Sequence, residues 1–156
     1  MTAEEKEQLE RDWRRFWPAI NNGFPKLKST KHQVTSPRNP QYNCIAWAAH
    51  NTNCWWWPAR DAFWPPNAPM TDNISSFHAA YNTLGFIPIE ETEIPNYREI
   101  IALMGNGTTV KHAMRLLPDG MWSSKLGEEF DISHEISSLE ESQYGVVIGF
   151  MGKDHK

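Results

Sequence analysis

A run of tryptophans and prolines constrains the fold of this chain more than any other feature of its sequence. Five of the eight tryptophans fall between Trp47 and Trp64, and prolines occupy positions 58, 65, 66 and 69. Because proline fixes φ and lacks a backbone donor, residues 54–69 can form neither a regular helix nor a central strand. We predict an ordered loop, held in place by its indoles, with at least one of Trp55–Trp57 partly exposed.

Helical patterns lie on both sides of this loop. Residues 3–17 place an apolar stripe along one helix face, and Pro18 is expected to end or kink that helix. A short helix is predicted to begin at or beside Cys44, with Asn43 as its cap, and to stop near residues 51–53. Thr71 or Asp72 is expected to cap a third helix that runs to residue 84. Residues 24–42 read as a surface loop.

The pattern changes after residue 85 to short apolar and β-branched segments separated by turn residues. These segments are 86–89, 100–104, 110–117, 121–125 and 146–151. Residues 118–120, Pro-Asp-Gly, indicate a hairpin, and the acidic stretch 126–143 is expected to hold a short helix near 136–141. Helices followed by an antiparallel sheet predict an α+β fold in a single domain, 1–156, with an N-terminal helix, 1–23, and a core, 42–152.

The bulk properties exclude several classes of function. The net charge is −4 and the 15 basic residues are scattered, which argues against a nucleic-acid partner. No apolar run reaches the roughly 20 residues needed to span a membrane. The charged N-terminus lacks a signal-peptide core, so we expect the cytoplasm, with export by a signal-less route left open. Two cysteines there should be free thiols. The oligomeric state does not follow from the sequence.

Cys44 and His112 form the strongest candidate for chemistry. A helix start lowers the pKa of a thiol and offers amides to an oxyanion, although such a cysteine can equally be a small core residue. His112 opens the predicted strand 110–117, just after the turn 105–107, where a cleft can form; alternatively, it is structural. A nucleophile at a helix start and an imidazole at a strand start together favour a thiol activated by a base.

A third polar group should orient the imidazole. Ser124 lies on the strand hairpinned to that of His112, and Asp131 and His134 follow in the segment DISHE. We favour Ser124 or His134 over Asp131. A zinc site is the less favoured alternative, because Cys44, His50, Cys54 and His78 match no compact ligand spacing. No metal or cofactor is therefore expected.

Around these residues the chain resembles the NlpC/P60 and CHAP branches of the papain-like cysteine hydrolases. The matching parts are Asn43-Cys44-Ile45-Ala46-Trp47, residues 100–104, residues 111–116 opening with Lys111-His112, and residues 119–124 ending in Ser124. The resemblance covers residues 42–125 and the last strand. It implies a papain-like fold with Cys44 as nucleophile, His112 as base and Ser124 at the third site. Here, Asn-Cys-Ile replaces the usual Asp-Cys-Ser or Asn-Cys-Ser start.

The chain is also similar to an uncharacterised group of bacterial domains marked by N-C-I-A-W-A, W-W-W-P and a later H-A-x-R-x-L…G-x-W-x-S-K-L-G stretch. This second resemblance is the closer one, and it implies no particular activity.

Two functions follow as hypotheses. The first is a cysteine hydrolase, a peptidase, amidase or deamidase, acting on a peptide, peptidoglycan-like or protein amide. Its substrate contacts would come from the residues around Cys44, the tryptophan-rich loop and the end of the hairpin. These are Asn43, Trp47, Trp55, Trp56, Trp57, Trp64 and Lys125. The alternative is a non-catalytic binding module of the same fold that presents the tryptophans to a partner, as a toxin, immunity or prophage component.

Overall fold

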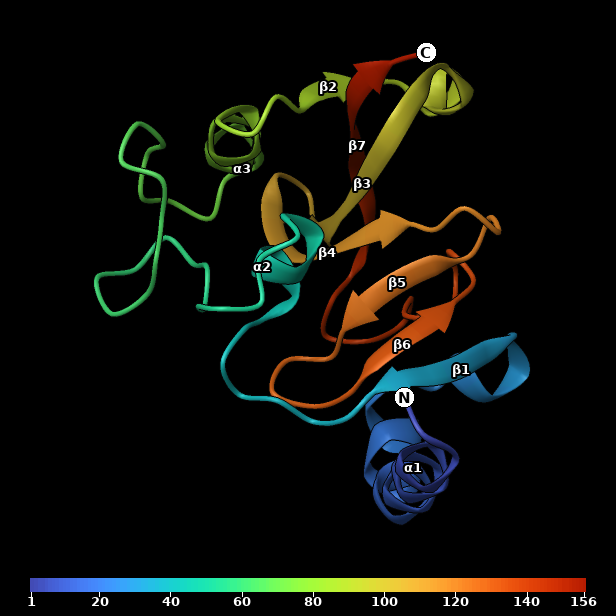
Figure 1. Ribbon diagram of the computed structural model, residues 1–156. Helices are drawn as coiled ribbons and strands as arrows, with labels where there is room; N and C mark the ends of the chain where they lie inside the picture. The colour runs from blue at the N-terminus through green and yellow to red at the C-terminus, as the bar shows by residue number, and fades with distance from the viewer.

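The computed structural model describes all 156 residues and shows a mixed α+β structure built on a seven-stranded antiparallel sheet (Figure 1). The strand order is β1-β6-β5-β4-β3-β7-β2. The strands are β1 (His32–Ser36), β2 (Ile87–Ile89), β3 (Tyr97–Asn106), β4 (Thr109–Leu116), β5 (Trp122–Lys125), β6 (Asp131–His134) and β7 (Val146–His155). The predicted α+β class and the hairpin at residues 118–120 are confirmed.

Helices and loops cover both faces of this sheet. The helices are α1 (Ala3–Gly23), α2 (Cys44–Ala48) and α3 (Ile74–Asn82), with 3-10 turns η1 (Leu27–Ser29) and η2 (Glu91–Asn96). One core packs α2, α3 and the tryptophan-rich loop against Leu103 and Ala113, and we call this side the α2 face. The other packs α1 against Met104 and Met114, and we call it the α1 face. Because side chains alternate along a strand, neighbouring residues of β4 serve different cores.

Helix α1 lies within the predicted N-terminal helix, 1–23, and runs through Pro18. Its first turn is closed by a capping box in which the Glu5 amide donates to the Thr2 hydroxyl at 3.1 Å. The helix continues to Gly23, so Pro18 does not end it. Packing explains this, because Trp17 stacks on His32 at 5.4 Å between ring centroids and Ile20 is buried beyond the proline. Tertiary contacts here outweigh the loss of one helical hydrogen bond.

Two strands were missed by sequence reasoning. Residues 24–42, predicted as a loop, contain β1, and the acidic stretch 126–143 contains β6 and turns instead of the predicted short helix. The two strands pair with each other, Val34 opposite Ile132, and both are only four or five residues long. Short polar strands carry too few alternating positions to be recognised, and their pairing across 100 residues is a tertiary event.

Smaller boundaries also differ. Helix α2 ends at Ala48, earlier than the predicted 51–53, and α3 is capped by Asn73 rather than by Thr71 or Asp72. The Asn73 side chain accepts from the Ser75 amide at 2.9 Å. No helix in the structure combines the length and apolar composition that crossing a bilayer requires.

Candidate active site

Asn43 fixes the start of α2 and leaves no side-chain group free for a substrate. Its carbonyl oxygen accepts from the amides of Ala46 at 3.1 Å and Trp56 at 3.0 Å, and its amide donates to the Trp56 carbonyl at 2.6 Å. The predicted cap is confirmed, and it also ties α2 to the tryptophan-rich loop. Of the substrate-binding candidates, Asn43 therefore has a structural task in this conformation.

Cys44 lies at the first position of α2 with only 7% of its surface exposed. Burial raises the pKa of its thiol to about 11, against the opposing effect of the backbone N–H groups of Ala113, Ile45 and Cys44 itself. The sequence predicted a lowered pKa from the helix start. Burial dominates because α2 has only five residues and the thiol packs in the core of the α2 face. Cys44 is therefore protonated at neutral pH in this conformation.

His112, Ser124 and His134 form one buried hydrogen-bonded chain on the α1 face. His112 Nε2 lies 2.9 Å from Ser124 Oγ, and Ser124 Oγ lies 2.7 Å from His134 Nε2. None of the three side chains is exposed to solvent. The structure thus brings together three of the four residues predicted as catalytic. Both favoured candidates for the orienting group belong to the hydrogen-bonded chain, because Ser124 contacts His112 and His134 contacts Ser124.

The direction of this chain follows from its last member. His134 Nδ1 lies 2.7 Å from the Glu135 carbonyl oxygen, which can only accept, so Nδ1 carries the proton. His134 Nε2 must then accept from the Ser124 hydroxyl, and Ser124 in turn accepts from His112 Nε2–H. This tautomer leaves a lone pair on His112 Nδ1. That atom is buried and has no hydrogen-bond partner.

Both imidazoles are neutral at pH 7. Burial lowers the pKa of His134 to about 4, and burial together with the nearby His134 lowers the pKa of His112 well below its usual value. A neutral imidazole with a free lone pair is the form that a general base requires. His112 is therefore neutral, as a general base must be, and Ser124 and His134 fix the orientation of its ring.

The thiol and the imidazole approach β4 from opposite faces of the sheet. Cys44 packs on the α2 face against Ala113, whereas His112 lies on the α1 face opposite Met104. The sulfur is within reach of the N–H of Ala113, the residue next to His112. A β-bulge leaves Lys111 unpaired just before His112, and β5 pairs with β4 only at Arg115 and Leu116. No hydrogen bond joins Sγ to the ring.

Tyr144, which sequence reasoning missed, covers the imidazole. Its ring stacks on His112 with centroids 4.0 Å apart and an interplanar angle of 9°. The next residue, Gly145, has φ +78°, and a Cβ there would lie 2.2 Å from the Gly105 carbonyl oxygen. Only glycine permits this approach, which holds Tyr144 in place. The Tyr-Gly pair just before the last strand is the sequence pattern that could have indicated this position of Tyr144.

The tryptophans divide between core and surface. Trp56 and Trp64 are buried at 4% and 8% exposure, whereas Trp55 and Trp57 are half-buried and line a surface hollow with Asp61. The expectation that one of Trp55–Trp57 is partly exposed is confirmed. Cys44 belongs to the same core of the α2 face as Trp56 and Trp64, so these two indoles contribute to packing.

Trp47 and Lys125 both serve internal contacts. The Trp47 indole N–H donates to Ser123 Oγ at 3.0 Å. Lys125 is fully buried, and its ammonium donates to the carbonyls of Gly127 and Glu129 at 2.7 Å each. Asp131, weighed and not favoured as the orienting group, lies on the same face as Lys125 and accepts from the Tyr42 hydroxyl at 2.8 Å. It does not contact His112.

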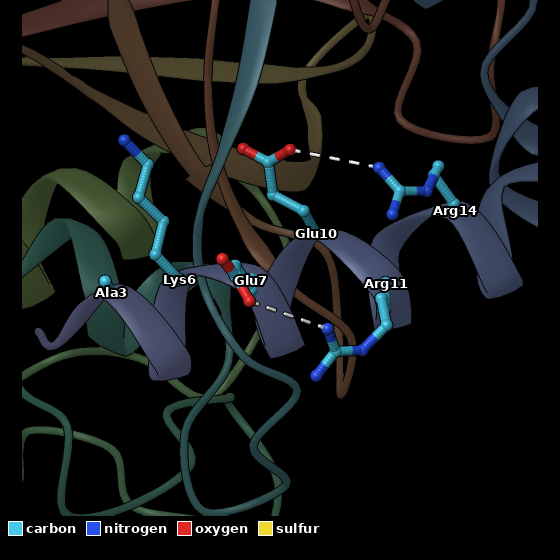
Figure 2. A pocket seen from close by; sticks show the side chains of 6 residues that line it. All are labelled: Ala3, Lys6, Glu7, Glu10, Arg11 and Arg14. Carbon is cyan, nitrogen blue, oxygen red and sulfur yellow. Dashed lines mark ion pairs between the residues drawn. The ribbon is translucent and has the colours of Figure 1, made fainter.

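The well-defined surface hollows lie away from the thiol. A hollow of about 500 Å³ is formed by charged side chains of α1, among them the ion pairs Arg11–Glu7 and Arg14–Glu10 at 4.0 Å (Figure 2). Such exposed pairs contribute little energy and define no site. Neither Cys44 nor His112 lines any of the five best-defined hollows. No three His, Cys, Asp or Glu side chains are grouped to hold a metal ion.

Comparison with known proteins adds one finding. Neither the curated proteins nor the solved structures gave a match. A family model described as a domain of unknown function, DUF7689, matches residues 33–152, which include α2, α3 and all seven strands except the first residue of β1 and the last three of β7. The chain belongs to the DUF7689 family.

Proposed function

We propose that this chain is a thiol hydrolase of the papain-like type, with Cys44 as nucleophile and His112 as general base. The observation that carries the proposal is the lone pair of His112 Nδ1, which is buried, free of any donor and oriented through Ser124 and His134. Leaving a buried polar atom unpaired costs roughly 1–3 kcal/mol, and pairing with the Cys44 thiol would satisfy this one.

The resting conformation is closed, so catalysis includes an opening step. The thiol must leave the Ala113 N–H, and β4 must rearrange before Sγ can meet His112 Nδ1, because the two side chains lie on opposite faces of that strand. Tyr144 must shift as well, because its ring covers the imidazole. In the open state the thiol contacts His112 Nδ1 and no longer lies in the apolar core that keeps it protonated.

The chemistry in the open state is acyl transfer. His112 Nδ1 takes the thiol proton, and the Cys44 thiolate attacks the carbonyl carbon of an amide. The backbone N–H of Cys44 donates to the developing oxyanion. Collapse of the intermediate breaks the C–N bond, and His112 returns the proton to the leaving amine. Water then hydrolyses the thioester with His112 again as base. Ser124 and His134 keep the ring in the required tautomer throughout.

Alkylation by iodoacetamide, mapped by mass spectrometry, tests this proposal, with Cys54 as the internal control. Cys54 is half-buried and hence more exposed than Cys44. We expect Cys44 to react several-fold faster than Cys54 in spite of its burial, and to slow at least tenfold in His112→Gln and in Ser124→Ala. Labelling of Cys54 alone in the native protein, with Cys44 modified only after denaturation, would reject the hydrolase.

The tryptophan-rich loop favours a second candidate, the non-catalytic binding module. Trp55 and Trp57 are half-buried, and Phe63 and Met70 of the same loop are 45% and 54% exposed. Apolar side chains that gather on one loop are typical of a surface that meets a partner. This function requires Cys44 only for packing, so Cys44→Ala would leave it intact while Phe63→Ser would abolish it.

A further inference from the structure

A second polar site lies at the opposite end of α2 from Cys44. A hollow of about 260 Å³ opens between the residues that follow α2 and the strands β3 and β4. Its polar lining consists of His50, Arg98, Glu99 and Arg115, and apolar side chains such as Phe86 and Leu116 form the rest. None of these residues was singled out as a substrate contact by the sequence.

Arg115 is held rigidly with half of its guanidinium unused. The group lies 3.7 Å above the Trp47 ring, and Nη1 donates to the Trp47 carbonyl at 3.3 Å and to His50 Nδ1 at 2.8 Å. Nε and Nη2 make no hydrogen bond, although the side chain is partly buried. These two nitrogens form the edge that binds a carboxylate through two parallel hydrogen bonds.

His50 holds Arg115 in this orientation. Its backbone has φ +60°, a left-handed conformation that is uncommon for residues other than glycine. Its Nδ1 accepts from Arg115, and its Nε2 lies 3.3 Å from Glu99. Burial and the nearby guanidinium lower the pKa of His50, so it acts as a neutral link between Arg115 and Glu99.

The charge balance of the hollow favours an anion. Glu99 is the only carboxylate in its lining, and it is already shared between His50 and Lys153, whose ammonium lies at 3.8 Å. Arg98 is exposed and makes no ion pair. Two guanidinium groups thus face the hollow with free donors, and the apolar lining provides room for an aliphatic group next to them.

We infer that this hollow binds a carboxylate attached to an apolar side chain, as found at the C-terminal residue of a peptide, with Arg115 as the bidentate donor and Arg98 as a second cation. Its use in substrate recognition rests on the proposed function. Trp47 lies three positions after Cys44 on α2, and Arg115 lies three positions after His112 on β4. The binding itself does not depend on catalysis.

Calorimetry with N-acetyl-leucine and with N-acetyl-leucinamide tests the inference on the full chain. We expect the acid to bind and the amide to bind at least tenfold more weakly. Arg98→Gln, an exposed change that leaves the fold intact, should weaken binding of the acid about three- to tenfold. Arg115→Lys, which keeps the charge and loses the fork, should weaken it at least tenfold. Arg60→Gln, an exposed arginine outside the hollow, is the matched control and should have no effect.

Two further outcomes separate this inference from the hydrolase. Cys44→Ser should bind N-acetyl-leucine as wild type does, so binding without rapid alkylation of Cys44 would reject the hydrolase and keep the site. Equal binding of acid and amide would overturn the inference. So would unchanged binding in Arg98→Gln together with Arg115→Lys, or competition by inorganic phosphate as effective as that of the acid, which would replace the carboxylate by a general anion.

Discussion

Two buried polar networks lie back to back on the sheet, and they differ in the charge of their members. Ser124 and Lys125 are consecutive on β5 and point to opposite faces. On the α1 face, Ser124 joins two neutral imidazoles. On the α2 face, Lys125 is a buried cation beside the carboxylate of Asp131. The network on the α2 face contains buried charges, whereas the network on the α1 face consists of neutral groups ordered by the direction of their hydrogen bonds.

The two networks also differ in how their polar groups are paired. Lys125 closes the turn between β5 and β6 by donating to two of its carbonyls, and the Asp131 pKa, raised by burial, is opposed by Tyr42 and Lys125. Two of the three N–H donors of the Lys125 ammonium are used in these bonds, and only the third is free. Each network leaves one buried atom without a hydrogen-bond partner, Asp131 Oδ1 on the α2 face and His112 Nδ1 on the α1 face. Of the two, only His112 Nδ1 is the lone pair of a neutral imidazole, the group that the proposed hydrolase would use as its base.

Loss of the buried cation should have the largest effect. Lys125→Met removes both hydrogen bonds to the turn and the nearby cation whose charge opposes the raised pKa of the buried Asp131. We expect the free energy of unfolding to fall by about 3 kcal/mol. Urea denaturation followed by tryptophan fluorescence measures it. Adding Asp131→Asn to Lys125→Met should recover part of the loss, and a loss below about 1 kcal/mol in the single variant would show that the charged network contributes little.

Acidification should weaken the imidazole network next. The pKa of His134 falls from 6.5 in the unfolded chain to about 4 in the fold, so the unfolded chain binds the additional proton in this window. Stability is therefore complete above pH 6.5 and falls by roughly 3 kcal/mol between pH 6.5 and 4. The lowered pKa of His112 acts in the same direction. Urea midpoints at pH 7.5, 6, 5 and 4 measure this loss.

Variants assign that pH dependence to one face. His134→Gln should flatten the profile, while His155→Gln, at an exposed position near the end of β7, should leave it unchanged. Asp131 works in the opposite direction, because a raised carboxyl pKa adds stability as the pH falls through it. Asp131→Asn should therefore steepen the loss. A flat profile in the wild type would contradict the neutral imidazole chain.

Adjacent serines offer a matched comparison of the two faces. Ser124→Ala leaves two buried ring nitrogens without a partner and should cost about 2 kcal/mol. Ser123→Ala removes only the bond from the half-buried Trp47 indole and should cost about 1 kcal/mol. Thermal melts of both variants at pH 7.5 measure the difference. Equal losses would indicate that the imidazole chain contributes no more than an ordinary hydrogen bond.

Tyr144 should give the smallest effect. Its hydroxyl makes no hydrogen bond to a protein group, and the stacking on His112 depends only on the ring. Tyr144→Phe should therefore change the free energy of unfolding by less than about 0.5 kcal/mol. Tyr144→Leu removes the stacked ring and should accelerate alkylation of Cys44 if the ring is the cover. Identical alkylation rates in Leu and Phe variants would rule that out.

Local chemistry made part of this structure predictable. Asn43 as the cap of α2, the hairpin at 118–120 and the α+β class follow from residue types at fixed spacing. Ser124 could be nominated as a partner of His112 because strand alternation gives each side chain a face, whereas His134 was nominated only as a polar residue of the following segment. The strands β1 and β6 could not be predicted, since each is short and β1 pairs with β6 across almost 100 residues.

The sequence alone determined which residues are candidates for chemistry: one thiol at a helix start, one imidazole at a strand start, and a serine and a histidine nominated as partners of that imidazole. Only the tertiary structure decided their state. Burial in two cores raised the pKa of Cys44 and lowered those of the imidazoles, because desolvation depends on how many atoms pack around a group and not on its neighbours in the chain. The same packing created the Arg115 hollow, whose residues come from α2, β3 and β4 and share no local pattern.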